Sequence, residues 1–195
     1  DKRLTHGIGQ AIWDLERLHM YPSELGLDLL VLAAHVHAAD TRISRATESQ
    51  DAWTREIRLV VPVSDVPRWM RAVPVLKQAL DFLTGDLWTV GFRARPQAFA
   101  SILPPRSGDN VSPPFDSISL FSGGLDSLIG AIDLLETGSH PLFVSHAGEG
   151  AISAAQDLCF DALKRHYSES GADRFRVWMT FDTGLVRNVG AEATT

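Results

Sequence analysis

The sequence predicts an α/β protein in which a parallel-sheet domain follows a smaller α+β domain. In residues 116–195, short apolar runs alternate with segments of helical period, the order typical of a parallel sheet with crossover helices. Residues 8–95 instead mix amphipathic helical segments with strand-like alternation. Between them, residues 96–116 are rich in proline, glycine and serine and have no apolar period, as in a linker. We therefore expect an N-terminal domain over residues 1–115 and a second domain over residues 116–195.

Changes of period along the chain predict the elements of the N-terminal domain. Apolar residues three and four apart indicate amphipathic helices, and alternation of apolar and polar residues indicates half-buried strands. Ser23 is a suitable N-cap, Pro62 should stop the first strand, and Pro74 is a point where the third helix can break. We expect a helical layer beside a short antiparallel strand pairing. The predicted helices cover residues 8–20, 24–39 and 66–83, and the predicted strands cover residues 54–61 and 87–95.

Four arginines lie on or next to these two predicted strands: Arg55, Arg58, Arg93 and Arg95. Neighbouring strands could align them into an anion-binding patch or a nucleic-acid surface. Charged positions on exposed sheets need no ligand, however, and we expect solvated strand faces. Nucleic acid is accordingly the least favoured partner.

The net charge of −6 is unevenly distributed. Residues 1–115 carry 13 basic and 13 acidic side chains, whereas residues 116–195 carry 5 and 11. The acidic half argues against a broad nucleic-acid surface but suits a cation such as Mg²⁺. No apolar run is long enough to span a bilayer, no signal peptide is visible, and the single cysteine, Cys159, fits a reducing compartment. We expect a cytoplasmic protein without a membrane partner.

The most informative stretch is Ser119-Leu120-Phe121-Ser122-Gly123-Gly124-Leu125-Asp126-Ser127. A predicted buried strand over residues 118–121 breaks into small residues and continues as a helix to about Thr137. The glycines permit a tight turn, and free N–H groups at a helix start favour a bound anion. The pattern predicts a phosphate-binding loop.

The segments after this loop continue a parallel βαβ order. Gly138 ends the first helix, and parallel strands joined by helices make right-handed crossovers. Loops at the carboxyl ends of such strands line the ligand sites of open α/β sheets. We expect a strand over residues 141–146, a helix over 151–168 and a strand over 174–181, so that the site is lined by residues 122–127, 145–150 and 181–183.

The run Ser122-Gly123-Gly124-Leu125-Asp126-Ser127 after an apolar strand resembles the PP-loop of the N-type ATP pyrophosphatases. It is not a Walker loop, because no Gly-Lys-Ser/Thr follows the glycines. The resemblance implies that the loop holds the pyrophosphate end of ATP while the α-phosphate adenylates a carbonyl or carboxylate. It also implies that residues 116–195 are only the first half of the domain, since domains of this family continue through further strands and helices.

The resemblance implies specific roles for the loop residues. Backbone N–H groups would bind phosphate oxygens at Gly123, Gly124 and Leu125, and hydroxyl groups would donate from Ser122 and Ser127. No residue is identified as a general base or a nucleophile. A hydrolase triad of Ser127, His146 and Asp182 is rejected, because a nucleophile elbow needs Gly-x-Ser-x-Gly.

Two further residues have alternative roles. A carboxylate at Asp126 would repel pyrophosphate unless a cation intervenes, so it either coordinates Mg²⁺ or caps the helix. His146, at the end of the next strand, either donates to a ribose or phosphate of ATP or closes a turn. Both alternatives stay open at this point.

Within this superfamily, Leu120–Ser127 resembles the opening of the 7-cyano-7-deazaguanine synthases, which make a nitrile from a carboxy-deazapurine with ATP and ammonia. Members usually carry a cysteine-rich zinc site, and one cysteine gives zinc no support here. The region before the loop is similar to synthase-like proteins of bacterial anti-phage cassettes, including the Qat type. The stretches concerned are Asp28-Leu29-Leu30, Ala39-Asp40-Thr41, Trp53-Thr54-Arg55-Glu56 and Leu83-Thr84-Gly85-Asp86-Leu87-Trp88.

These resemblances imply an ATP-dependent adenylating enzyme that serves in anti-phage defence. Its acceptor would be a deazapurine-like molecule, a modified nucleotide or a protein, and its partners would be other proteins of the cassette. The alternative is a catalytically inactive nucleotide-sensing or scaffold subunit that keeps the loop.

Overall fold

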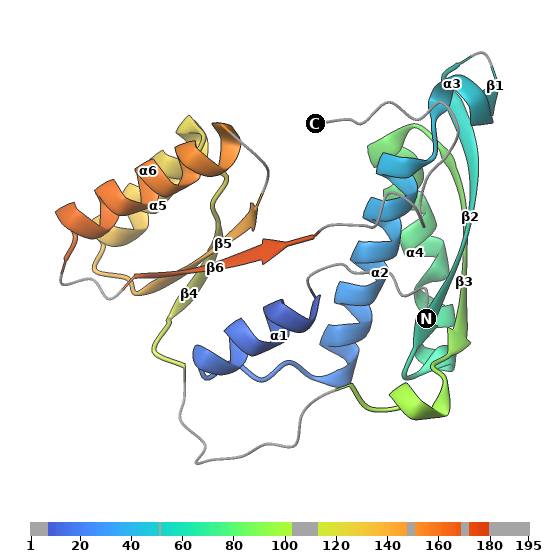
Figure 1. Cartoon of the computed structure of the whole chain (residues 1–195), viewed down its shortest axis with the longest axis horizontal. Helices are drawn as coiled ribbons and strands as arrows, with labels where there is room; N and C mark the ends of the chain where they lie inside the picture. The colour runs from blue at the N-terminus through green and yellow to red at the C-terminus, as the bar shows by residue number, and fades with distance from the viewer. Residues whose placement is uncertain (1–7, 51, 103–112, 148–150, 169–171, 180–195) are drawn as a thin grey trace. The chain divides into compact units, whose positions relative to one another are not determined.

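The computed structural model describes residues 8–50, 52–102, 113–147, 151–168 and 172–179. These residues form two compact units (Figure 1). The first unit is built from residues 22–102, and the second from residues 8–21 together with 113–179. Among the described helices, none is both long and apolar enough to cross a membrane.

The first unit is a small sheet with helices on one face. Helix α2 (Glu24–Arg42) begins at the predicted N-cap, where Ser23 Oγ accepts from the N–H of Gly26 at 3.1 Å. The buried core lies between α2, α4 and the strands, at Leu32, Ile57, Leu59, Val61, Val63, Trp69, Trp88 and Val90. The remaining elements are α3 (Arg45–Glu48), β1 (Ser49–Gln50), β2 (Thr54–Val63), α4 (Val66–Thr84), β3 (Leu87–Ala94) and the 3₁₀ turn η1 (Gln97–Phe99).

Strands β2 and β3 run parallel, so the predicted antiparallel pairing is wrong. Their register runs from Glu56 opposite Leu87 to Val63 opposite Ala94. The 19-residue helix α4 connects them and returns the chain to the starting edge of the sheet, as a parallel crossover requires. Among the described strands of this sheet, β1 alone runs antiparallel, and it pairs with the first two residues of β2.

Neither proline acts as a break. Strand β2 continues through Pro62. The carbonyl of the next residue, Val63, accepts from the N–H of Arg95 at 3.2 Å, on the β3 side of the strand. Backbone groups of successive residues point to opposite sides of a strand. The backbone of Pro62 therefore faces the edge away from β3, where no ladder bond is lost. Helix α4 is likewise continuous through Pro74, which lies on its exposed side.

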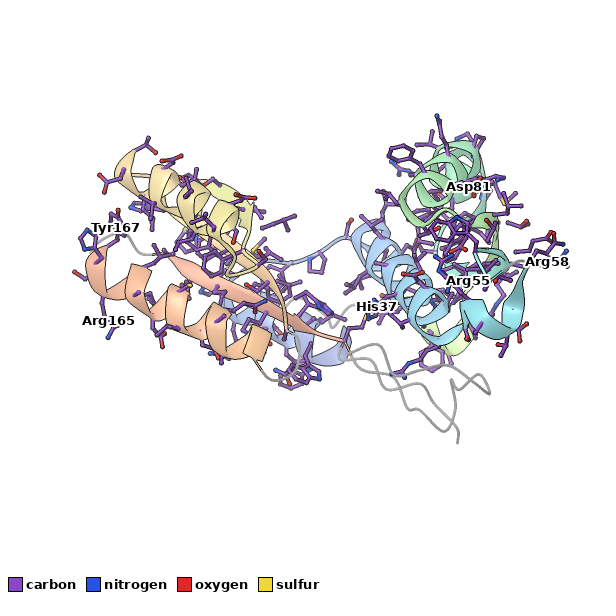
Figure 2. The ribbon with its side chains drawn as sticks, turned by 90° about the horizontal axis from the view of Figure 1, so that it is seen from above. His37, Arg55, Arg58, Asp81, Arg165 and Tyr167 are labelled. Carbon is purple, nitrogen blue, oxygen red and sulfur yellow. The ribbon has the colours of Figure 1, made fainter. Side chains whose placement is uncertain are left out.

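The expectation of solvated arginines fails for two of the four. Arg55 is 2% exposed and lies on the same strand face as the buried Ile57, whereas Arg58 is exposed and points outward (Figure 2). Arg55 donates to Asp86 from both its backbone N–H (2.9 Å) and its guanidinium. Arg95 is also buried and pairs with Asp28 and Glu24.

The second unit is a parallel α/β layer structure, which confirms the predicted order over the described residues. Its strands are β4 (Ser117–Leu120), β5 (Pro141–Ala147) and β6 (Asp173–Trp178), in the order β4-β5-β6 with both pairings parallel. Helices α5 (Leu125–Glu136) and α6 (Ala151–His166) pack on one face, and α1 (Ile8–Arg17) packs on the other (Figure 1).

The placement of α1 differs from the predicted boundary at residue 115, which assigned this helix to the N-terminal domain. Ala11 of α1 forms a buried core with Leu142 of β5 and Phe175 of β6. Strand β5 is apolar on both faces, since Phe143 packs toward α5 and α6 while Leu142 packs toward α1. A parallel strand of this kind needs a cover on each side.

Strand β4 is less buried than the sequence suggests. Phe121, immediately after it, is 1% exposed and belongs to the core with α5 and α6. Ile118 and Leu120 are exposed, because they lie on the face of β4 that no described helix covers.

Candidate functional site

The candidate site is the loop between β4 and α5. Its entrance is fixed to the neighbouring strand, because the N–H of Phe121 donates to the carbonyl of Val144 at 2.8 Å and Ser145 Oγ donates to the carbonyl of Phe121 at 2.6 Å. Ser145 is 1% exposed. The chain therefore leaves β4 in one defined direction.

Gly123 has a backbone conformation that only glycine adopts easily. Its φ is 78°, in the left-handed region. A Cβ built on it would lie 2.8 Å from Cα of Gln156 and 3.0 Å from Cγ of the same residue. Space and dihedral angle therefore both require glycine here.

Helix α5 starts with N–H groups that the helix itself does not use. Gly124 is the N-cap residue and supplies no side-chain cap. The first hydrogen bond of the helix runs from the N–H of Leu128 to the carbonyl of Gly124 at 3.0 Å. The N–H groups of residues 125–127 precede this bond, and they lie at the positive end of the helix dipole. This arrangement suits an anion.

The two predicted serines lie side by side at this helix start. Their hydroxyl oxygens are 3.1 Å apart. Ser122 Oγ accepts from the N–H of Gly124 at 3.3 Å, and Ser127 Oγ donates to the carbonyl of Gly124 at 2.9 Å. The structure therefore brings the predicted loop residues 122–127 together and places two hydroxyl groups beside the free N–H groups.

Asp126 is exposed in the first turn of α5. It is not the N-cap residue, since Gly124 occupies that position. No group of three or more metal-ligating side chains occurs among the described residues.

His146 is placed differently from the loop residues. It is exposed, and alternation along β5 puts its side chain on the sheet face of Leu142 and Val144, which is the face that α1 covers. Helix α5 packs on the opposite face. The backbone carbonyl of His146 accepts from Gln156 Nε2 at 3.0 Å, which connects the end of β5 to α6.

Ser145 lies in the predicted lining segment 145–150, whereas Gln156 is a residue of the site that sequence reasoning missed. Gln156 is four residues before Phe160 and seven before Leu163, so it lies on the apolar face of α6. A polar residue on such a face is a detectable signal of a buried polar contact. The predicted strand-end residues 148–150 and 181–183 lie outside the described residues.

An apolar groove also occurs in this unit, between α5 and α6. Its volume is about 360 Å³, and its lining includes Leu128, Ile132, Leu158 and Cys159. Most of this lining is apolar. His166 and Tyr167 also border the groove, and the hydroxyl of Tyr167 already donates to Glu136. The groove therefore does not compete with the loop as a phosphate site.

The chain matches no protein-family model, no curated protein and no solved structure.

Proposed function

We propose that residues 122–127 bind the phosphate groups of ATP and that the protein adenylates an acceptor carboxylate or carbonyl with release of pyrophosphate. The observation that carries the proposal is the start of α5, where three N–H groups precede the first helical hydrogen bond next to two serine hydroxyls. Backbone donors at a helix N-terminus are a well-matched site for phosphate oxygens.

In this proposal the loop acts by positioning and by charge neutralisation. The N–H groups of residues 125–127 bind oxygens of the departing pyrophosphate. The hydroxyls of Ser122 and Ser127 rotate from their mutual contact toward those oxygens. The acceptor oxygen then forms a bond to the α-phosphorus as the bond between the α-phosphorus and its bridging oxygen breaks.

Asp126 would hold Mg²⁺ together with phosphate oxygens. When bound, the cation would neutralise the charge of the phosphates, which a lone carboxylate would otherwise repel. The exposure of Asp126 and its place in the first turn of α5 leave room for such a role.

The acceptor and the biological role follow from the resemblance. We propose chemistry similar to that of 7-cyano-7-deazaguanine synthases, in a cytoplasmic anti-phage system with partner proteins. The acceptor would be a deazapurine-like molecule, a modified nucleotide or a protein. An inactive nucleotide-sensing or scaffold subunit that keeps the loop is the second candidate.

The test is incubation of the protein with ATP, Mg²⁺ and candidate acceptors, with AMP and pyrophosphate as the measured products. Formation of both products supports the enzyme. Binding of ATP without turnover supports the sensing subunit instead. Absence of ATP binding contradicts both candidates.

A double substitution, Asp126→Ala with Ser127→Ala, should abolish ATP binding as measured by calorimetry. The matched control is Asp133→Ala, which removes a carboxylate from an exposed position on the same helix and should leave affinity unchanged. Equal ATP affinities for the wild type and the double variant would refute the assignment of the loop.

A further inference from the structure

Gln156 lies where the loop, β5 and α6 meet. It is 2% exposed, which is rare for a glutamine. The loop passes so close to it that a Cβ on Gly123 would approach its Cα, Cγ and N to 3.0 Å or less. The main chain and side chain of Gln156 therefore limit where the loop can run.

Gln156 also forms hydrogen bonds with the two neighbouring strands. Its Nε2 donates to the carbonyl of His146 at 3.0 Å, and its main-chain carbonyl accepts from Arg174 Nη1 of β6, also at 3.0 Å. One residue thus connects the loop after β4 with β5 and β6. The carboxyl ends of parallel strands are where open α/β sheets bind ligands.

The side-chain amide of Gln156 leaves one atom unused. Its Oε1 is buried and has no donor within the part of the chain that the structure describes. This oxygen is two bonds from the Cγ that borders Gly123. Buried acceptors without a donor are unfavourable, and they mark places that water or a ligand completes.

We propose that Gln156 is the positioning residue of the phosphate-binding loop. It acts through the backbone of Gly123 and His146, and it keeps the loop in the shape that presents the N–H groups of residues 125–127. The inference rests on the proposed function of this loop, and it adds a residue on α6 that no loop motif contains.

The test uses Gln156→Met, which keeps the length of the side chain but removes its amide. Backbone ¹⁵N order parameters of Gly123 and Gly124 should fall from about 0.85, typical of rigid backbone, to below about 0.6 in the ligand-free protein. The dissociation constant for pyrophosphate with Mg²⁺, measured by calorimetry, should rise about tenfold, the usual effect of one lost hydrogen bond. Gln156→Glu, which keeps size but loses the donor to His146, should change both in the same direction.

The control is Leu163→Ala on the same helix, a buried core residue. It should lower the melting temperature while the order parameters of Gly123 and Gly124 stay unchanged, which separates lost stability from lost positioning. Unchanged order parameters in both Gln156 variants overturn the inference. If the wild type binds neither pyrophosphate nor ATP, the proposed function fails, and the order parameters still decide whether Gln156 positions the loop.

Discussion

At the scale of single residues, glycine conformation decides the geometry of the loop. Gly123 and Gly138 have nearly equal φ values of 78° and 77°. An added Cβ at Gly138 would meet nothing within 4 Å, whereas one at Gly123 would clash with α6. Alanine substitutions at these two positions therefore distinguish the free-energy cost of dihedral strain from that of steric overlap.

We predict that Gly123→Ala destabilises the protein more than Gly138→Ala. Gly138→Ala should cost about 1 kcal/mol from strain alone. Gly123→Ala should cost roughly 1–3 kcal/mol more, in the range of overpacking in a closed site. Urea unfolding measures both free energies, and ATP binding should weaken only in the Gly123 variant.

Equal unfolding free energies for the two variants would contradict the close packing of the loop on Gln156. Gly130→Ala, in the middle of α5 with open space around the new methyl group, is a further control. It should be stabilising by roughly 1 kcal/mol through helix propensity.

At the scale of elements, two buried carboxylates fasten β2 and β3 at opposite ends. Asp28 of α2 accepts from Ser64 Oγ at 2.6 Å and from Trp69 Nε1 at 2.9 Å, and it pairs with Arg95 after β3. Asp86, before β3, pairs with Arg55 at the start of β2. These contacts hold a two-strand parallel pairing that would be weak on its own.

Asp86 makes the first unit sensitive to acid. Burial raises the pKa of this carboxyl, but hydrogen bonds from Arg55 and Arg45 outweigh burial and bring its pKa to about 2, from 3.8. Because the folded pKa is depressed, the stabilisation is complete above pH 4 and is lost as pH falls from about 4 to 2. Its size is about 2 kcal/mol.

We predict that Asp86→Asn reduces the fall in unfolding free energy between about pH 4 and pH 2. Urea unfolding at several pH values, followed by tryptophan fluorescence, should show a steeper loss of stability below pH 4 in the wild type than in the variant. The variant should also be less stable at pH 7 by roughly 3–5 kcal/mol, since Arg55 stays buried without its main partner. Parallel profiles for the two proteins would contradict the role of Asp86.

At the scale of the whole molecule, the second unit is assembled from two separate parts of the sequence. Residues 8–21 precede the first unit in the chain, yet α1 packs on the sheet of the second. Ala11 is 2% exposed in that core. The second unit therefore depends on a helix that lies roughly a hundred residues before its first strand in the sequence.

We predict that Ala11→Arg unfolds the second unit while the first stays folded. A buried arginine without a partner is strongly unfavourable, with an expected loss of several kcal/mol. Hydrogen exchange read by mass spectrometry should show protection lost in β5 and β6 but kept in β2 and β3. Gln10→Arg, at an exposed neighbouring position on the same helix, is the matched control and should leave both patterns unchanged. Protection of β5 in the Ala11 variant would contradict the packing of α1.

Local patterns in the sequence determined the elements and the loop. Helical spacing, strand alternation and the position of glycines depend on residues a few places apart, so the helix starts, the βαβ order and the cluster of residues 122–127 were predictable. A glycine at position 123 suits the positive φ found there, but the local sequence does not distinguish Gly123 from Gly124, whose φ is −83°.

Contacts between distant residues decided the rest. Four features depend on contacts between residues that are from 31 to more than a hundred positions apart in the sequence. They are the parallel direction of β3 against β2, the burial of Arg55 against Asp86, the packing of α1 on the second sheet and the close approach of Gln156 to Gly123. The energy of such contacts depends on which groups are buried together away from water, and the spacing of residues within a short segment does not reveal which groups these are. The sequence by itself therefore determined where the candidate phosphate loop lies, and only the tertiary structure decided what holds it in shape.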